Sequence, residues 1–153
     1  MNRAFLFKTV ANLWPPFLGA GIRIKRITDD FTTIDVEMKF GILNRNYVGT
    51  QFGGSIYAMT DPFFMMILLE NLGKEYIVWD KAAEVKFKKP GTSKLFAHFH
   101  IPKHKIAEIR AAADANYKTE PRFTVEIKNA AGDVVAEVEK LLYVRHVSRE
   151  KRA

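Results

Sequence analysis

Apolar and polar residues alternate along several short segments of the chain, and each alternation predicts a β-strand with one buried face. The clearest alternation covers 33–40, where apolar side chains occupy every second position. A period of two over a run of this length is typical of a half-buried strand. The same pattern predicts further strands at 22–25, 85–88, 95–101, 123–127 and about 134–146.

One segment, about 54–72, shows no alternation and is apolar on nearly every side. Two glycines precede it and Gly73 follows it, as a C-terminal stop would. A helix that is apolar all round is surrounded by protein, so we expect a long central helix here. Shorter helices are predicted at about 3–13, where Pro15-Pro16 ends the pattern, and at about 103–115.

The order of these elements determines the fold class. Strands do not alternate regularly with helices, which excludes a doubly wound parallel sheet. An α+β fold fits better, with a curved antiparallel sheet around the one long helix. Residues 1–153 contain no repeat and no linker, so we expect a single domain with one core.

Composition and charge exclude several kinds of function. The absence of cysteine rules out disulfides, thiolate metal sites and a cysteine nucleophile. The N-terminus does not resemble a secretory signal peptide, and the longest apolar stretch, 62–69, is far shorter than the roughly 20 residues that cross a bilayer. We therefore expect a cytoplasmic protein without a membrane span.

The charge surplus limits the sign of the partner. Lys and Arg number 24 against 17 Asp and Glu, a net charge of +7. A surplus of this size favours an anionic partner, such as nucleic acid, a membrane surface or a phosphate-bearing small molecule. The basic residues form no recognised nucleic-acid motif, so we expect no nucleic-acid partner.

Asp61 is the most informative polar residue. It lies seven positions after Gly54, the second glycine of Gly53-Gly54, and is the only acidic residue in 38–69. Glycines at a helix start let a ligand approach unpaired backbone N–H groups, and a carboxylate in apolar surroundings needs a partner or a catalytic role. Asp61-Pro62 is also a plain helix start, with Asp as N-cap. The residues alone leave both interpretations open.

The spacing of Gly54 and Asp61 has a geometric consequence. Seven residues are two helical turns, so the two positions share a helix face but lie ~10 Å apart. One helix cannot direct both at the same substrate atom. Two antiparallel helices across a two-fold axis can, which predicts a site shared between the subunits of a dimer.

These residues support a resemblance to a known family. Asn46, Phe52-Gly53-Gly54, Asp61 and the later strand 85–91, Val-Lys-Phe-Lys-Lys-Pro-Gly, resemble the hotdog-fold acyl-CoA thioesterases. The phenylacetic-acid-type branch and its uncharacterised relatives are the nearest in pattern. The resemblance implies the hotdog fold and a homodimer or dimer of dimers.

The resemblance also implies roles for individual residues. Asp61 would act on an acyl-coenzyme A thioester as general base or nucleophile, Gly54 would polarise the carbonyl, and Asn46 would position water or substrate from the partner chain. Other substrate contacts would come from Gln51, Phe52, Gly53, Lys86, Lys88 and Lys89. The three lysines would hold the coenzyme A phosphates, or else they are solvated strand charges. No cofactor or metal is implied beyond coenzyme A in the substrate.

Two departures from the family pattern keep alternatives open. Phe52 replaces the usual histidine, which favours a non-catalytic hotdog module that binds an acyl thioester or lipid. Pro62 directly after Asp61 removes one helical hydrogen bond. A hotdog dehydratase ranks last because no histidine lies in or near the helix. His98 and His100 share one strand face, where a solvent-facing pair is a better interpretation than a metal site.

Overall fold

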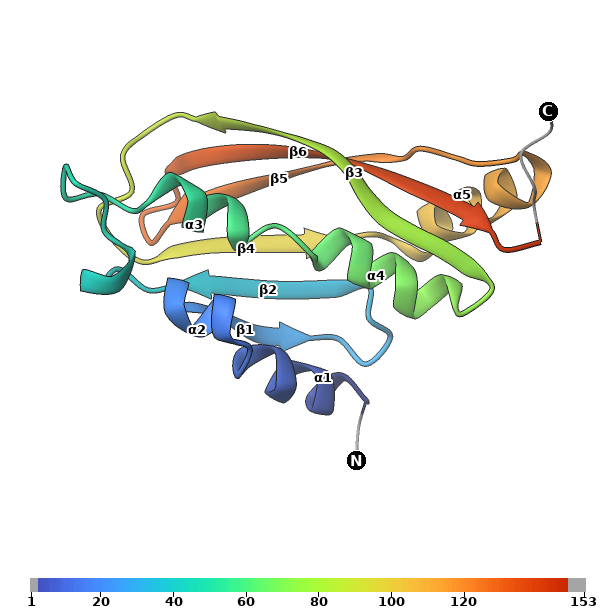
Figure 1. The fold of residues 1–153 in the computed structure, drawn as a ribbon, viewed down its shortest axis with the longest axis horizontal. Coiled ribbons are helices and arrows are strands. Elements are labelled where there is room, and N and C mark those ends of the chain that lie inside the picture. The colour runs from blue at the N-terminus through green and yellow to red at the C-terminus, as the bar shows by residue number, and fades with distance from the viewer. Residues whose placement is uncertain (1–2, 149–153) are drawn as a thin grey trace.

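The structure, a computed structural model, describes residues 3–148 and contains one antiparallel sheet of six strands (Figure 1). The strands are β1 Ile22–Ile27, β2 Thr33–Met38, β3 Tyr76–Phe87, β4 Leu95–His100, β5 Arg122–Asn129 and β6 Val134–His146. Their order across the sheet is β1-β2-β4-β5-β6-β3, so β1 and β3 are its edges. Every neighbouring pair is antiparallel.

Helices cover one face of the sheet and its ends. They are α1 Arg3–Asn12, α2 Pro15–Ala20, the 3-10 helix η1 Ile42–Asn44, α3 Gly53–Ala58, α4 Phe63–Leu72 and α5 Lys103–Ala115. In Figure 1, α3 and α4 lie across the sheet, while α1 and α2 lie beside β1. No helix within residues 3–148 is long and apolar enough to cross a membrane.

The core forms between α4 and the inward faces of the strands. Phe63, Ile67 and Leu68 of α4 are fully buried, and the Phe63 ring lies 5.0 Å from that of Phe99 on β4. β4 alternates strictly between buried and exposed residues, as its sequence predicts. The predicted α+β hotdog architecture is confirmed.

The prediction of a single helix over about 54–72 is corrected. Two helices, α3 and α4, occupy this segment, and residues 59–62 form the turn between them. Pro62 explains the break because its ring has no N–H and clashes with the carbonyl four residues earlier. The N–H of Asp61 instead donates to Ala58, three residues back, at 3.3 Å. Asp61 therefore lies in a turn between two helices.

The edge strand β3 is longer than the sequence pattern predicts. The alternation identified only the part from Val85, whereas β3 begins at Tyr76. A bulge between Asp80 and Ala82 inserts one extra residue opposite β6. The inward positions are even-numbered before the bulge and odd-numbered after it, so no constant period of two runs through the strand.

The two prolines near the N-terminus end one helix and begin another. α1 stops before them, as predicted, and Pro15 and Pro16 then open α2. Proline suits the first helical positions because their N–H groups have no intrahelical partner. Gly21 ends α2 with φ of 69°, a left-handed conformation that favours glycine.

Candidate active site

The Asp61 carboxylate forms a cluster with side chains from α3 and β6. Its side chain is 54% exposed. Oδ1 accepts a hydrogen bond from the Tyr57 hydroxyl at 3.0 Å and one from the Lys140 ammonium at 3.2 Å. Pro62, the N-cap of α4, makes no side-chain cap, and Asp61 bonds elsewhere. The interpretation of Asp61 as a simple N-cap is therefore wrong.

Lys140 is the buried centre of this cluster. It occupies an inward position of β6, in a row that otherwise consists of Ala136, Val138, Leu142 and Val144. Its side chain is 0% exposed. Nζ donates to Asp80 Oδ2 at 2.9 Å and to the Tyr57 hydroxyl at 3.3 Å, besides Asp61. Three donors thus meet three acceptors, which is the full capacity of an ammonium group.

The carboxylates keep Lys140 charged despite its burial. Burial alone lowers the pKa of Lys140, but the ion pairs with Asp80 and Asp61 outweigh it and the pKa is raised. Burial raises the pKa of Asp80, against the opposing effect of Lys140. Burial is also the main cause of the raised pKa of Tyr57. Two carboxylates therefore share one buried cation.

Sequence analysis missed Lys140, Asp80 and Tyr57, although one signal was available. Counting the inward positions of the predicted strand 134–146 places Lys140 in an apolar row, where a lysine needs a partner. Asp80 had no such signal because the β3 bulge interrupts the alternation. The contact between Lys140 and Asp61 joins residues that are 79 positions apart in the sequence, and no local pattern reveals such a contact.

Gly53 and Gly54 each lie against an aromatic ring. A Cβ on Gly53 would lie 3.1 Å from the Phe87 ring of β3, and one on Gly54 would lie 2.5 Å from the Phe52 ring. No side chain fits at the second position without displacing Phe52. The glycines therefore allow close packing at the start of α3, with the Phe52 ring beside Gly54.

Asn46 and Gln51 brace the loop before α3. The Asn46 side chain donates to the Thr50 hydroxyl at 2.8 Å and accepts from the Thr50 N–H at 2.9 Å, which closes the loop. Gln51 is 2% exposed and donates to the carbonyls of Lys39 and Ser93. Its Oε1 is buried and has no partner among residues 3–148. Both side chains are therefore engaged with the loop and its neighbours.

The three predicted lysines are exposed and each faces a carboxylate. The pairs are Lys86 with Glu84 at 3.7 Å, Lys88 with Glu137 at 2.9 Å and Lys89 with Asp133 at 2.9 Å. Such surface pairs contribute little to stability and open readily. Lys86 points away from the helices, because its neighbours Val85 and Phe87 pack toward them.

The histidines of β4 pair with neighbouring side chains of β2. His98 Nδ1 lies 2.5 Å from Asp35 Oδ1, and His100 Nδ1 lies 2.8 Å from the Thr33 hydroxyl. Over the part of the chain that the structure describes, no three His, Cys, Asp or Glu side chains are grouped to hold a metal ion.

Comparison with known proteins identifies the family. A family model described as a domain of unknown function (DUF4442) matches residues 2–144. The chain belongs to the DUF4442 family. No curated protein matches this DUF4442 sequence.

Solved structures share the fold of this DUF4442 chain at low sequence identity. A Pseudomonas aeruginosa protein described as a probable thioesterase has a TM-score of 0.84 and 17% identity, over 93% of this chain and 95% of that one. A Chlorobaculum tepidum protein of unknown function has a TM-score of 0.76 and 15% sequence identity, over 94% of both chains. A Haemophilus influenzae protein described as a thioesterase has a TM-score of 0.68 and 12% identity, over 99% of this chain and 96% of that one. The predicted hotdog fold is thereby confirmed.

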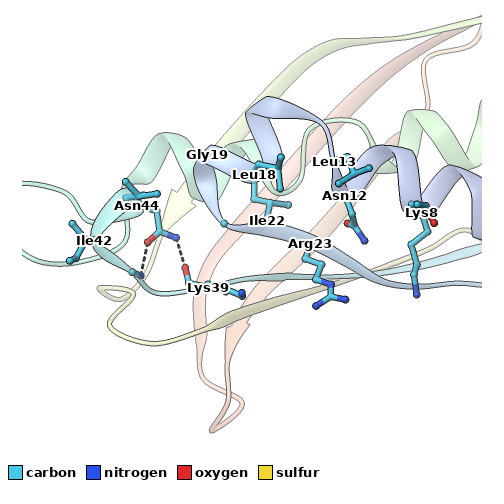
Figure 2. A pocket seen from close by; sticks show the side chains of 14 residues that line it. Lys8, Asn12, Leu13, Leu18, Gly19, Ile22, Arg23, Lys39, Ile42 and Asn44 are labelled. Carbon is cyan, nitrogen blue, oxygen red and sulfur yellow. Dashed lines mark hydrogen bonds between the residues drawn. The ribbon is translucent and has the colours of Figure 1, made fainter.

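The DUF4442 chain also has a groove beside its first edge strand. It holds about 680 Å³ and lies between α1, α2, β1 and η1. Figure 2 shows Leu13, Leu18 and Ile42 along it, with Arg23 and Lys39 on the same groove. Asn44 fixes one end by donating to the carbonyls of Ala20 and Lys39. The groove combines aliphatic and cationic side chains.

Proposed function

We propose that the chain hydrolyses the thioester of an acyl-coenzyme A to the free acid and coenzyme A. The observation that carries the proposal is the half-exposed Asp61 carboxylate, held at Oδ1 by the Tyr57 hydroxyl and the Lys140 ammonium. A carboxylate in a fixed orientation and open to solvent is suited to act on water or on a bound carbonyl.

As a general base, Asp61 accepts a proton from water while the water oxygen attacks the thioester carbon. The negative charge then develops on the former carbonyl oxygen, to which the Gly54 N–H would donate. Cleavage of the carbon–sulfur bond releases the thiolate, which takes the proton back from Asp61. Asn46 would enter from the partner chain and position the water or the substrate, and Lys86, Lys88 and Lys89 would attract the coenzyme A phosphates.

As a nucleophile, Asp61 would instead attack the thioester carbon, and cleavage of the carbon–sulfur bond would expel the coenzyme A thiolate and leave a mixed anhydride. Water then hydrolyses this anhydride to the free acid and the Asp61 carboxylate, and the proton released in that step protonates the thiolate. A single turnover in ¹⁸O-labelled water distinguishes the two routes. When water attacks the anhydride at the aspartyl carbon, the label enters the Asp61 carboxylate. The general-base route puts it only into the released acid.

Lys140 fixes the orientation of Asp61 in this proposal. Its ammonium donates to Asp61 Oδ1, which holds that oxygen inward and leaves the other oxygen free to act on water or the thioester. Asp80 binds the same ammonium from the other side. Lys140 is a positioning residue, since its full burial prevents contact with a substrate.

The site needs a second copy of the chain. β3 is an edge strand, and residues 81–84 near its bulge are exposed on both faces. Pairing of two β3 strands about a two-fold axis would join the sheets and bring the α3 start of one copy toward Asp61 of the other.

A panel of acyl-coenzyme A chain lengths assayed for thiol release tests the proposal. We expect Asp61→Asn to lower kcat/KM by about a hundredfold or more. Glu126→Gln removes a carboxylate from an exposed lysine pair and should leave the rate unchanged. If Asp61→Asn cleaves every substrate as fast as the wild type, the role of Asp61 is wrong.

A non-catalytic module that binds an acyl thioester is the second candidate. The observation that favours it is the Phe52 ring beside Gly54, where the resembling family carries a polar histidine. This alternative predicts thermal stabilisation by acyl-coenzyme A without thiol release. Measured turnover by the wild type would exclude it.

A further inference from the structure

The positive charge of the chain is concentrated in two segments, residues 1–28 and 38–60. Together they contain seven Lys and Arg residues and no Asp or Glu. The whole chain has a surplus of seven positive charges, so the rest of the sequence is balanced. Three of these cations pair with carboxylates from elsewhere: Arg3 with Glu70, Lys25 with Glu37 and Arg26 with Asp35.

Three other cations of these segments line the groove in Figure 2, namely Lys8, Arg23 and Lys39. Among residues 3–148, no carboxylate forms an ion pair with any of them. Lys8 Nζ donates to the Lys25 carbonyl at 3.1 Å, and Arg23 and Lys39 are exposed residues. The groove thus presents positive charge that the protein does not neutralise.

The outer side of α1 and α2 is apolar, where a surface helix is ordinarily polar. We call it the α1–α2 face; each member is about half exposed, and they are Phe5, Leu6, Val10, Leu13, Trp14 and Leu18. Ile42 and Leu43 of η1 continue it across the groove, with 88% and 87% exposure. Contiguous apolar surface of this kind marks an interaction site.

We propose that the α1–α2 face and its groove dock onto the surface of an anionic phospholipid bilayer. The leucines and Trp14 would enter the boundary between headgroups and acyl chains, while Lys8, Arg23 and Lys39 contact the phosphates and carboxylates. α1 has ten residues and is ~15 Å long, about half the thickness of the hydrocarbon layer, so it would lie in the interface plane.

Charge favours a bilayer over a second copy of the chain. Two copies each bring this same acid-free surface to the contact, and like charges would face one another. Nucleic acid matches the charge but offers no place for the aliphatic side chains, since its outer surface is phosphate and sugar. An anionic bilayer supplies both an apolar layer and negative charge.

Vesicle binding tests the proposal independently of any hydrolysis, so it can also be run with Asp61→Asn protein. We expect the wild type to co-sediment with vesicles of equal parts phosphatidylcholine and phosphatidylserine, and not with phosphatidylcholine alone. High salt should release it, because screening weakens the attraction. In a Trp79→Phe background, the remaining Trp14 fluorescence should shift to shorter wavelength on binding.

Variants separate the two contributions to binding. Arg23→Gln with Lys39→Gln should weaken binding about thirtyfold, at ~1 kcal/mol for each cation. Lys105→Gln with Lys118→Gln removes the same net charge elsewhere and should change binding by no more than about threefold. Leu13→Ser with Leu18→Ser should abolish the Trp14 shift, whereas Val147→Ser should not.

Several outcomes would overturn the proposal. It fails if the wild type binds neither vesicle, or if both charge variants lose binding equally. It also fails if the wild type does not bind vesicles and the double variant Leu13→Ser/Leu18→Ser has a lower mass in sedimentation than the wild type. That result would identify the α1–α2 face as an interface between subunits. Salt-sensitive binding to duplex DNA without vesicle binding would show that the cationic groove binds nucleic acid and not a bilayer.

Discussion

Lys140 shows how a single residue gives an apolar sheet a polar site. A lysine in an inward row between Val138 and Leu142 would be strongly destabilising without partners. Asp80, Asp61 and Tyr57 each accept one of its hydrogen bonds, so the buried charge is satisfied. Because burying the lysine without partners would be unfavourable, its ammonium binds the Asp61 carboxylate and holds it in one position at the solvent-exposed side of the cluster.

Substitutions at Lys140 and Asp80 should lower the rate of thiol release to different degrees. Lys140→Met removes the ammonium that holds Asp61 Oδ1, so kcat should fall by about tenfold or more while KM changes little. Asp80→Asn leaves the contact between Lys140 and Asp61 in place, so kcat should fall less.

Glu108→Gln is the control, because it removes a carboxylate from an exposed lysine pair on α5. A purely structural role would lower the melting temperature of both site variants and leave the kcat of the folded protein unchanged. Equal losses of kcat in Lys140→Met and Asp80→Asn would contradict the positioning role of Lys140.

The stability of the wild type should decline at high pH through Lys140. Its pKa is raised in the folded protein, so the folded state holds this proton more tightly than the unfolded state. The stabilisation is complete below about pH 10.4 and is lost as the pH rises above that value. Lys140→Met should cost on the order of 2 kcal/mol at neutral pH, less than for a fully buried pair because Asp80 is partly exposed.

Urea unfolding of both proteins at neutral and strongly alkaline pH measures this effect. The difference in unfolding free energy should shrink at alkaline pH, because only the wild type has the lysine proton to lose. A difference that stays constant over the whole range would mean that the ion pairs do not stabilise the folded state.

At the scale of elements, Pro62 separates two helices and thereby places Asp61. A continuous helix would keep Asp61 in the same rigid cylinder as Gly54. The turn over 59–62 instead lets α3 and α4 take separate courses, and Asp61 can turn toward Lys140 on β6. The departure from the family pattern at Pro62 therefore helps to form the cluster.

Pro62→Ala should lengthen α4 toward α3, since alanine supplies the missing N–H and favours the helix. We expect slower amide hydrogen exchange over 59–63 and a lower rate of thiol release, because Asp61 is drawn away from Lys140. Pro16→Ala in α2 is the matched control. Unchanged exchange over 59–63 would show that the turn is set by packing and not by the proline.

The spacing of apolar residues predicted the helices and strands in which that spacing is regular. It did not predict the elements in which the spacing changes part-way. β4 and the helix near 103–115 follow from regular spacing of apolar residues. The first half of β3 was missed because a bulge changes its inward positions at Asp80. Asp61 was found from its isolation among apolar residues, whereas its partners come from other elements and required the assembled sheet.

At the scale of the whole molecule, the two edges of the sheet differ in chemistry. The β1 edge adjoins the cationic groove and the apolar α1–α2 face. The β3 edge is open and carries the Asp80 bulge. If two copies join through β3, the two α1–α2 faces lie toward the outer ends of the joined sheet, and dimer formation leaves both open to a partner.

Ala82→Lys tests self-association through β3, because Ala82 is exposed and lies on the face of the strand opposite to Lys140. Antiparallel pairing about a two-fold axis sets like segments of the two copies beside each other, so the introduced lysines would lie close and repel. We expect the wild type to sediment at twice the 17.5 kDa chain mass, or a multiple of that, and the variant to shift toward the single chain. Ala130→Lys adds the same charge in the exposed turn between β5 and β6 and should leave the mass unchanged.

The rate of hydrolysis should fall in the variant whose mass falls, because Gly54 and Asp61 of the shared site would then belong to chains that no longer associate. Full activity in a monomeric Ala82→Lys protein would place the whole site within one chain.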